Sequence, residues 1–419
     1  MKALIAAALL ATAAPVAAQT AEAPAPAPAL APASAAPRTP PKLIVAISVD
    51  QFSADLFQQY RNHFSDGFAR LLTGVVFPSG YQSHAATETC PGHSTILTGM
   101  RPAHTGIVAN NWIDQSIARP DKTVYCAEDE TVPGTDHDHY VVSDKHLKVP
   151  TLGEMMKTAD PRTRVVSVAG KDRAAVMMGG HKVDELWWWD GKTYSTYAGR
   201  AVPRAVQRGR DAVAALVAKP QEPLPLPAYC QPLDRPITVA GTVYGQGRFA
   251  RTAGDLKAFR ASPASDAAVF AIAAGLIQDM GLGRGPHTDI IDIGASATDY
   301  IGHSLGTQGT EMCIQMDQLD STLGSFFRTL DSWGIDYEVV LTADHGAHDM
   351  TERQQQHAMP MEEHVSGDAS IKAVNATIVQ QFGLKGPALL GAEGDVYLAK
   401  DLPANIRPRV LAEAQKRFA

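Results

Sequence analysis

The stretch Lys42-Leu-Ile-Val-Ala-Ile-Ser-Val-Asp50 decides the fold, because a continuous apolar run that ends in a carboxylate is typical of a buried strand in a parallel sheet. The run from Tyr337 to Ala343 repeats this design and is followed by Asp344 and His345. Open parallel sheets bind ligands at the carboxyl ends of their strands. We therefore expect Asp50, Asp344 and His345 to meet at one edge of a sheet and to bind a metal ion there.

A third apolar run, from Thr288 to Ile293, precedes Asp299 and His303. A carboxylate and an imidazole four residues apart face the same side of a helical turn. This pair is suited to zinc, so the pattern predicts a second metal about 3.5–4 Å from the first, as in two-metal phosphoryl-transfer sites. The alternatives are a helix N-cap at Asp50 and a capped loop with a surface histidine at His303.

The candidate nucleophile is the hydroxyl of Thr89. Pro91 and Gly92 precede an expected helix from His93 to Thr98, and the N-terminus of a helix favours anions. A threonine alcohol is a poor nucleophile unless metal coordination lowers its pKa, so Thr89 is expected both to attack and to bind metal. The residue types alone leave four alternatives open, which are Thr87, Cys90, Ser94 and Thr95.

Candidate ligands for phosphoryl oxygens follow an expected strand from Thr163 to Ala169. Lys171 supplies a point charge and Arg173 a planar fork, and both suit phosphoryl oxygens. Asn110 ends the run that begins at Gly106 and can donate to the same oxygens. A solvated basic turn and an ordinary asparagine turn are the alternatives.

Taken together, these motifs resemble the alkaline phosphatase superfamily, and within it the exported, broad-specificity PafA/PhoK-like enzymes that use threonine as nucleophile. They occur in the family's order and cover most of residues 42–350. The matching segments are Val49-Asp50-Gln-Phe, Thr89-Cys-Pro-Gly-His93, Gly106-Ile-Val-Ala-Asn110-Asn-Trp112, Gly170-Lys171-Asp-Arg173, Asp299-Tyr-Ile-Gly-His303 and Thr342-Ala-Asp344-His345-Gly346.

The resemblance implies an enzyme that uses two zinc ions to hydrolyse small phosphate monoesters through a phosphothreonine at Thr89; calcium is a further possible ion. One zinc would be held by Thr89, Asp50, Asp344 and His345. The other would be held by Asp299, His303 and one more histidine. The non-bridging phosphoryl oxygens would be held by Asn110, Lys171 and Arg173.

Two alternatives to this function remain open. A phosphodiesterase or nucleotide pyrophosphatase can use the same scaffold, although the Lys-x-Arg pair favours a dianionic monoester. The family's last zinc histidine belongs to a Gly-Thr-x-His-Gly segment that does not occur before Ala419. We therefore expect the C-terminal end of the domain to be missing and the second zinc site to be incomplete, which leaves an impaired shell that only binds metal or anion as the other alternative.

Composition restricts the class of protein. The chain has 419 residues, 45% of them apolar, which suffices for a sizeable core, and a net charge of −7 gives no support for binding nucleic acid or a membrane surface. Residues 1–18 are expected to be a signal peptide and residues 19–41 an Ala/Pro-rich linker. No later stretch is expected to span a membrane, so the predicted location is the periplasm or the medium; no oligomeric state is indicated.

The predicted fold is α/β, with a central, mostly parallel sheet flanked by helices across residues 42–419. The segment from about 175 to 265 breaks the alternation of strands and helices and is expected to form an inserted cap, with a hairpin around Trp187–Trp189. In an oxidising compartment the four cysteines can form one or two disulfides. Of the three pairings we favour Cys90 with Cys126, and free, buried cysteines are the alternative.

Overall fold

The computed structural model describes residues 39–77, 80–357, 359–392 and 394–418. Residues 41–419 form one compact unit. The predicted signal peptide and nearly all of the linker lie outside the described residues. Within the described part of the chain, no helix is long and apolar enough to cross a bilayer.

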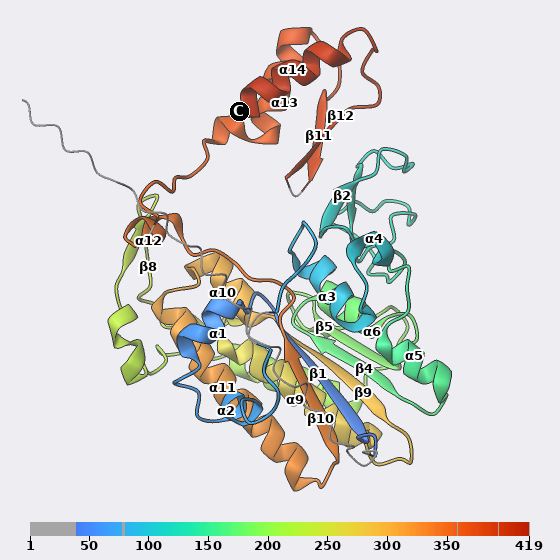
Figure 1. The fold of residues 1–419 in the computed structure, drawn as a ribbon, viewed down its shortest axis with the longest axis vertical. Helices are drawn as coiled ribbons and strands as arrows, with labels where there is room; N and C mark the ends of the chain where they lie inside the picture. The colour runs from blue at the N-terminus through green and yellow to red at the C-terminus, as the bar shows by residue number, and fades with distance from the viewer. Residues whose placement is uncertain (1–38, 78–79, 358, 393, 419) are drawn as a thin grey trace, which may run out of the picture. The chain divides into compact units, whose positions relative to one another are not determined.

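A six-stranded sheet forms the centre of the fold (Figure 1). Every neighbouring pair is parallel except the last, which confirms the predicted, mostly parallel sheet. The register aligns the carboxyl ends, since Ser48 lies opposite Thr342 and Val49 opposite Ala295. The strand order is β10 (Tyr337–Thr342), β1 (Leu43–Val49), β9 (Asp289–Ala295), β4 (Val165–Ala169), β5 (Glu185–Trp189) and β6 (Tyr194–Ser195).

Helices cover both faces of the sheet (Figure 1). Alternate residues of β1 point to opposite sides, as the pleat requires, so Val45 and Ile47 enter one apolar cluster while Ala46 enters another. The first cluster draws on α7 (Arg204–Val217), α9 (Pro263–Met280) and α11 (Thr310–Ser332). The second draws on α3 (Thr89–Thr98), α5 (Leu152–Ala159) and α6 (Asp172–Gly179). The apolar runs of β1, β4 and β9 are thus buried on both faces.

The remaining elements are short or lie outside the central sheet. They are α1 (Ala54–Tyr60), α2 (Gly67–Leu71), α4 (Pro102–Thr105), β2 (Asn111–Ile113), β3 (Thr123–Tyr125), η1 (Ala228–Leu233), β7 (Ile237–Val239), β8 (Thr242–Tyr244), α8 (Leu256–Arg260), α10 (Ala297–Leu305), α12 (Thr351–Gln355), η2 (Gly367–Ala369), α13 (Ile371–Phe382), β11 (Leu389–Ala392), β12 (Asp395–Leu398) and α14 (Arg407–Phe418). The last two strands and two helices share an apolar cluster of their own.

The predicted start of the cap at residue 175 is wrong. Trp187–Trp189 belongs to β5, which pairs in parallel with β4, and β6 extends the same sheet as the antiparallel arm of the expected hairpin. Trp187 is fully buried. The tryptophans alternate between the two faces of the sheet, and their burial comes from helices distant in sequence, which a local pattern does not reveal. Within the predicted cap, the part that lies outside the central sheet and its helices is the segment between α7 and α8, which contains η1 and the β7–β8 hairpin.

All four cysteines are paired in two disulfides. Cys90 of α3 is bonded to Cys126, which follows β3, and Cys230 of η1 is bonded to Cys313 of α11. The favoured pairing is confirmed, and the alternative of free cysteines is excluded.

Candidate active site

Three of the predicted metal ligands converge at the carboxyl ends of β1 and β10. Asp50 directly follows β1, while Asp344 and His345 follow β10, the neighbouring strand. Their ligand atoms lie within 4.8 Å of one another, and all three residues are buried. Among the residues that the structure describes, this is the one group of three His, Cys, Asp or Glu side chains close enough to hold an ion.

The carboxylate oxygens of this group are buried and face positively charged or imidazole nitrogens. Lys171 Nζ lies 2.7 Å from Asp50 Oδ2, His345 Nε2 lies 3.3 Å from Asp50 Oδ1, and Asp344 Oδ2 has an imidazole nitrogen at 3.0 Å. The remaining oxygen of Asp344 is fixed by the backbone N–H of Gln51 at 3.0 Å. Carboxylate oxygens and imidazole nitrogens are the ligand types, besides cysteine sulfur, that zinc takes in proteins. Two carboxylates and an imidazole therefore fit a divalent cation such as zinc.

The second predicted pair lies on α10, as its spacing indicated. His303 Nε2 lies 3.2 Å from Asp299 Oδ1, and the Asp299 side chain is nearly buried whereas that of His303 is 71% exposed. The Nε2 of Gln51 donates to the same Asp299 oxygen at 2.9 Å. That oxygen also lies 3.9 Å from His345 Nε2, so the two ligand pairs adjoin.

The hydroxyl of Thr89 lies beside both predicted basic ligands of the phosphoryl group, Lys171 and Arg173. Its Oγ1 accepts from Lys171 Nζ at 3.3 Å and from Arg173 Nη2 at 3.4 Å. Thr89 is the first residue of α3, so the helix begins four residues earlier than predicted. Pro91 does not prevent this, since a proline in the first helical turn lacks only an N–H that has no intrahelical acceptor.

Charge at the site is balanced within a small volume. Lys171 Nζ lies 2.7 Å from Asp50 Oδ2 and 2.5 Å from Asp299 Oδ2. Burial lowers the pKa of Lys171, but the two carboxylates raise it to a net value above normal. Burial likewise lowers the pKa of His345, but Asp50 and Asp344 raise it to about 9 overall. Lys171 therefore stays protonated at neutral pH.

Asn110 lies beside the start of α3 and is not hydrogen-bonded to the hydroxyl of Thr89. Its Oδ1 accepts from the backbone N–H of Cys90 at 2.8 Å, and the backbone N–H of Asn110 donates to Glu88 Oε2 at 2.7 Å. The carboxamide NH₂ is thereby left as the donating end of the side chain.

The rivals to Thr89 have other roles. Cys90 is in a disulfide, and the hydroxyls of Ser94 and Thr95 both donate to the carbonyl of Pro91 within α3. Thr87 lies outside α3, and no hydrogen bond in the described part of the chain joins its hydroxyl to Lys171 or Arg173.

The sequence reasoning missed His93. It lies one helical turn after Thr89, is fully buried, and places Nδ1 2.9 Å from the carbonyl oxygen of Thr89 and 3.0 Å from Asp344 Oδ2. The i, i+4 spacing of Thr89 and His93 was a visible signal, but the partner on β10 was not. Burial raises the pKa of the Asp344 carboxyl, whereas His93 and His345 lower it well below its ordinary value on balance.

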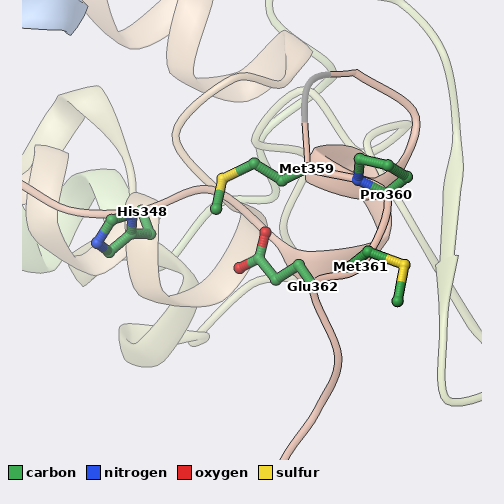
Figure 2. A pocket seen from close by; sticks show the side chains of 5 residues that line it. All are labelled: His348, Met359, Pro360, Met361 and Glu362. Carbon is green, nitrogen blue, oxygen red and sulfur yellow. The ribbon is translucent and has the colours of Figure 1, made fainter.

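Another histidine of the described chain, His348, is not joined to this site. It lines a hollow of about 620 Å³ together with Met359, Pro360, Met361 and Glu362 (Figure 2). Within the described residues, no hydrogen bond or ion pair joins His348 to a predicted metal ligand.

Known proteins resemble this chain over most of its length. The family model described as type I phosphodiesterase / nucleotide pyrophosphatase matches residues 44–402. Alkaline phosphatase PhoK of a Sphingomonas species is 56% identical over 99% of this chain and 75% of its own length. Alkaline phosphatase PhoD of Zymomonas mobilis is 42% identical over 90% of this chain and 66% of its own length.

A solved structure extends the likeness to the fold. The crystal structure of alkaline phosphatase PafA superposes with a TM-score of 0.75 at 27% identity, covering 91% of this chain and 78% of that one. The PafA sequence from Elizabethkingia meningoseptica is 29% identical over 90% of this chain and 73% of its own length. The chain therefore belongs to the alkaline phosphatase superfamily, as a PafA/PhoK-like alkaline phosphatase.

Proposed function

We propose that this alkaline phosphatase hydrolyses phosphate monoesters of broad structure through a phosphothreonine at Thr89, with two zinc ions as cofactors. Phosphoester hydrolysis itself follows from its relatives. The observation that carries the rest is the position of the Thr89 hydroxyl, 3.3 Å from Lys171 and 3.4 Å from Arg173, at the sheet edge that gathers Asp50, Asp344 and His345.

The metal ligands divide into two sets. Asp50, Asp344 and His345, with the Thr89 hydroxyl, would hold one zinc, and Asp299 with His303 would hold the other. When bound, the ions would lower the pKa of the Thr89 hydroxyl and of water and would neutralise developing negative charge.

The side chains then divide the reaction between them. The oxygen of Thr89 attacks phosphorus and releases its hydroxyl proton, the bond from phosphorus to the ester oxygen breaks, and the departing alcohol takes up one proton, so the protons balance. In the second half, the oxygen of water forms the new bond to phosphorus and Thr89 regains its hydroxyl proton as phosphate departs. Lys171 and Arg173 face the phosphoryl oxygens throughout and stabilise the charge spread over them.

The positive charges of Lys171 and Arg173 favour monoesters over diesters. A monoester presents two negative charges to Lys171 and Arg173, whereas the additional substituent of a diester removes one of these charges. Hydrolysis of diesters or of nucleotide pyrophosphates is the second candidate, and the description of the matching family model supports it.

The site is proposed to work outside the cytoplasm. Support comes from the signal-like first 18 residues and from the pairing of all four cysteines, because disulfides persist in oxidising compartments.

Zinc content measured alongside hydrolysis of a simple aryl phosphate tests the proposal. The purified chain should carry zinc, should lose activity with a strong chelator and should regain it with zinc. An aryl phosphodiester should be hydrolysed much more slowly under the same conditions. Full activity in metal-free protein, or faster hydrolysis of the diester, would refute this assignment.

A further inference from the structure

A buried carboxylate, that of Asp172, stands between Lys171 and Arg173 in the sequence. Asp172 occupies the first turn of α6 and receives two phenolic hydroxyls: Tyr125 donates to Oδ1 at 2.8 Å, and Tyr140 donates to Oδ2 at 2.7 Å. The backbone N–H of Arg173 donates to Oδ1 as well, at 2.7 Å. Both carboxylate oxygens are thus occupied, and the orientation of the side chain is fixed.

The backbone of Arg173 connects this carboxylate to the nucleophile. Its N–H is bonded to Asp172, and the Nη2 of the same residue reaches Thr89. Burial and the charge of Asp172 raise the pKa of both tyrosines, so the hydroxyls keep their protons and donate. Both tyrosines are therefore bonded to Asp172, Asp172 is bonded to the backbone of Arg173, and the guanidinium of Arg173 reaches the nucleophile.

The tyrosines come from one segment, between α4 and α5, that is also fixed to the nucleophile. Tyr125 ends β3, and the next residue, Cys126, is bonded to Cys90 beside Thr89. The rings of Tyr125 and Tyr140 contact each other with centroids 4.5 Å apart. The segment thus holds the start of α3 on one side and the start of α6 on the other.

We propose that Tyr125 and Tyr140, acting through Asp172, are positioning residues that fix the guanidinium of Arg173 for a charged phosphoryl oxygen and thereby set the preference for monoesters over diesters. This inference rests on the proposed function of Arg173. Neither tyrosine touches the reacting atoms. Their effect is to prevent the guanidinium from turning away from the Thr89 hydroxyl.

Removal of single hydroxyl groups tests the idea. Tyr125→Phe should lower kcat/KM for an aryl phosphate monoester roughly 10- to 100-fold, the loss expected when hydrogen bonds to charged groups disappear. Hydrolysis of the corresponding diester should fall by less than about threefold, because the diester presents one negative charge fewer to Arg173. Tyr194→Phe is the matched control, because Tyr194 is fully buried and its hydroxyl has no partner in the described part of the chain. This control should leave both rates unchanged.

A double-mutant cycle identifies the route of the effect. In an Arg173→Ala background, Tyr125→Phe should cause almost no further loss on the monoester, because the group it positions is gone. If Tyr125→Phe instead causes its full loss in that background, the inference is overturned. Normal monoester hydrolysis in Arg173→Ala alone would overturn the proposed function of Arg173, which is a separate failure.

Tyr140→Phe and thermal unfolding guard against a purely structural explanation. Tyr140 lies at the far oxygen of Asp172, so its loss should give the same selective decrease in monoester hydrolysis at a smaller magnitude. Unfolding temperatures of Tyr125→Phe and Tyr140→Phe should stay close to that of Tyr194→Phe. Equal losses on monoester and diester in both variants would show general damage to the site and would refute the positioning role.

Discussion

His93 Nδ1 lies 3.0 Å from Asp344 Oδ2, and both side chains are completely buried. Because the same nitrogen lies 2.9 Å from the carbonyl oxygen of Thr89, the imidazole joins the start of α3 to the end of β10. Its two neighbours are acceptors, so Nδ1 carries the proton. The nucleophile and a predicted metal ligand are therefore oriented by one ring.

Replacement of His93 should weaken metal binding. We expect His93→Ala to lower zinc affinity or activity about 10- to 100-fold, as is usual when a group that orients a metal ligand is removed. Competition with a chelating dye measures the affinity. His104→Ala serves as the control, since His104 is exposed. Unchanged zinc affinity in His93→Ala would show that Asp344 needs no support from the imidazole.

Thr89→Ala should abolish turnover while leaving the fold intact. The loss should reach about 10³-fold or more, since a nucleophile is removed outright. Thr89→Ser retains a hydroxyl and should keep part of the activity. Mass spectrometry of acid-quenched protein should find a phosphoryl group on Thr89 in the parent chain only; a phosphoryl group on another residue would assign a different nucleophile.

Removal of the positive charges of Lys171 and Arg173 should affect the hydrolysis of monoesters and of diesters to different extents. Lys171→Ala with Arg173→Ala should lower kcat/KM for monoesters about 10²- to 10³-fold, as expected for groups that stabilise transition-state charge. The loss on diesters should be much smaller. Steady-state kinetics on both substrates measure this, and equal losses on the two would contradict the specificity argument.

The two disulfides should differ in their effect on catalysis. Double serine variants of Cys90–Cys126 and Cys230–Cys313, which span 36 and 83 residues, should each lower the free energy of unfolding by about 2–5 kcal/mol. Activity of the folded protein should fall only in the first variant, because the Cys90 N–H is bonded to Asn110. Denaturant titrations and kcat/KM together measure this, and equal activity in both variants would contradict it.

Asp266 should make stability depend on pH. Burial raises its pKa to about 7, while the N–H of Ala297 and the side chain of Gln315 donate to it. A carboxyl group whose folded pKa is raised stabilises the fold below its unfolded pKa, near 4, and loses that contribution as pH rises to 7. The asparagine in Asp266→Asn stays uncharged at every pH. Between pH 5 and pH 8 the free energy of unfolding of this variant should therefore fall less than that of the parent, by on the order of a few kcal/mol.

Thermal unfolding of the parent and of Asp266→Asn at both pH values tests this expectation. Gln315 can turn its carboxamide and present Oε1, which has no hydrogen-bond partner in the described structure, to the asparagine NH₂. A variant that shows the same pH dependence as the parent would assign the effect to other groups.

Local patterns predicted the elements that end in ligands. The strand before Asp50 is a largely apolar run, the strand before Asp344 is apolar except for Glu338 and Thr342, and Asp299 with His303 has a helical spacing. Each feature was visible within a few neighbouring residues. The convergence of their ends then follows from parallel pairing, which puts carboxyl ends at one edge.

Features that depend on distant contacts were not predictable. The bonds from Tyr125 and Tyr140 to Asp172 join positions 47 and 32 residues apart, and no local spacing encodes them. The prediction that Trp187–Trp189 belongs to an inserted cap was wrong for the same reason, since only the packing of helices shows that this segment is an inner strand. The start of α3 was placed too late because Pro91 was taken to lie before the helix rather than in its first turn.

The position of β10 at one end of the central sheet has a consequence for handling the protein in solution. Val339 and Leu341 pack against the core, while Glu338 is exposed and Val340 is 54% exposed, so one face and one backbone edge of this strand are open within the described structure. Such an edge is a template for intermolecular strand pairing, and a charge on it discourages that association. We therefore expect the charge of Glu338 to discourage aggregation of concentrated protein.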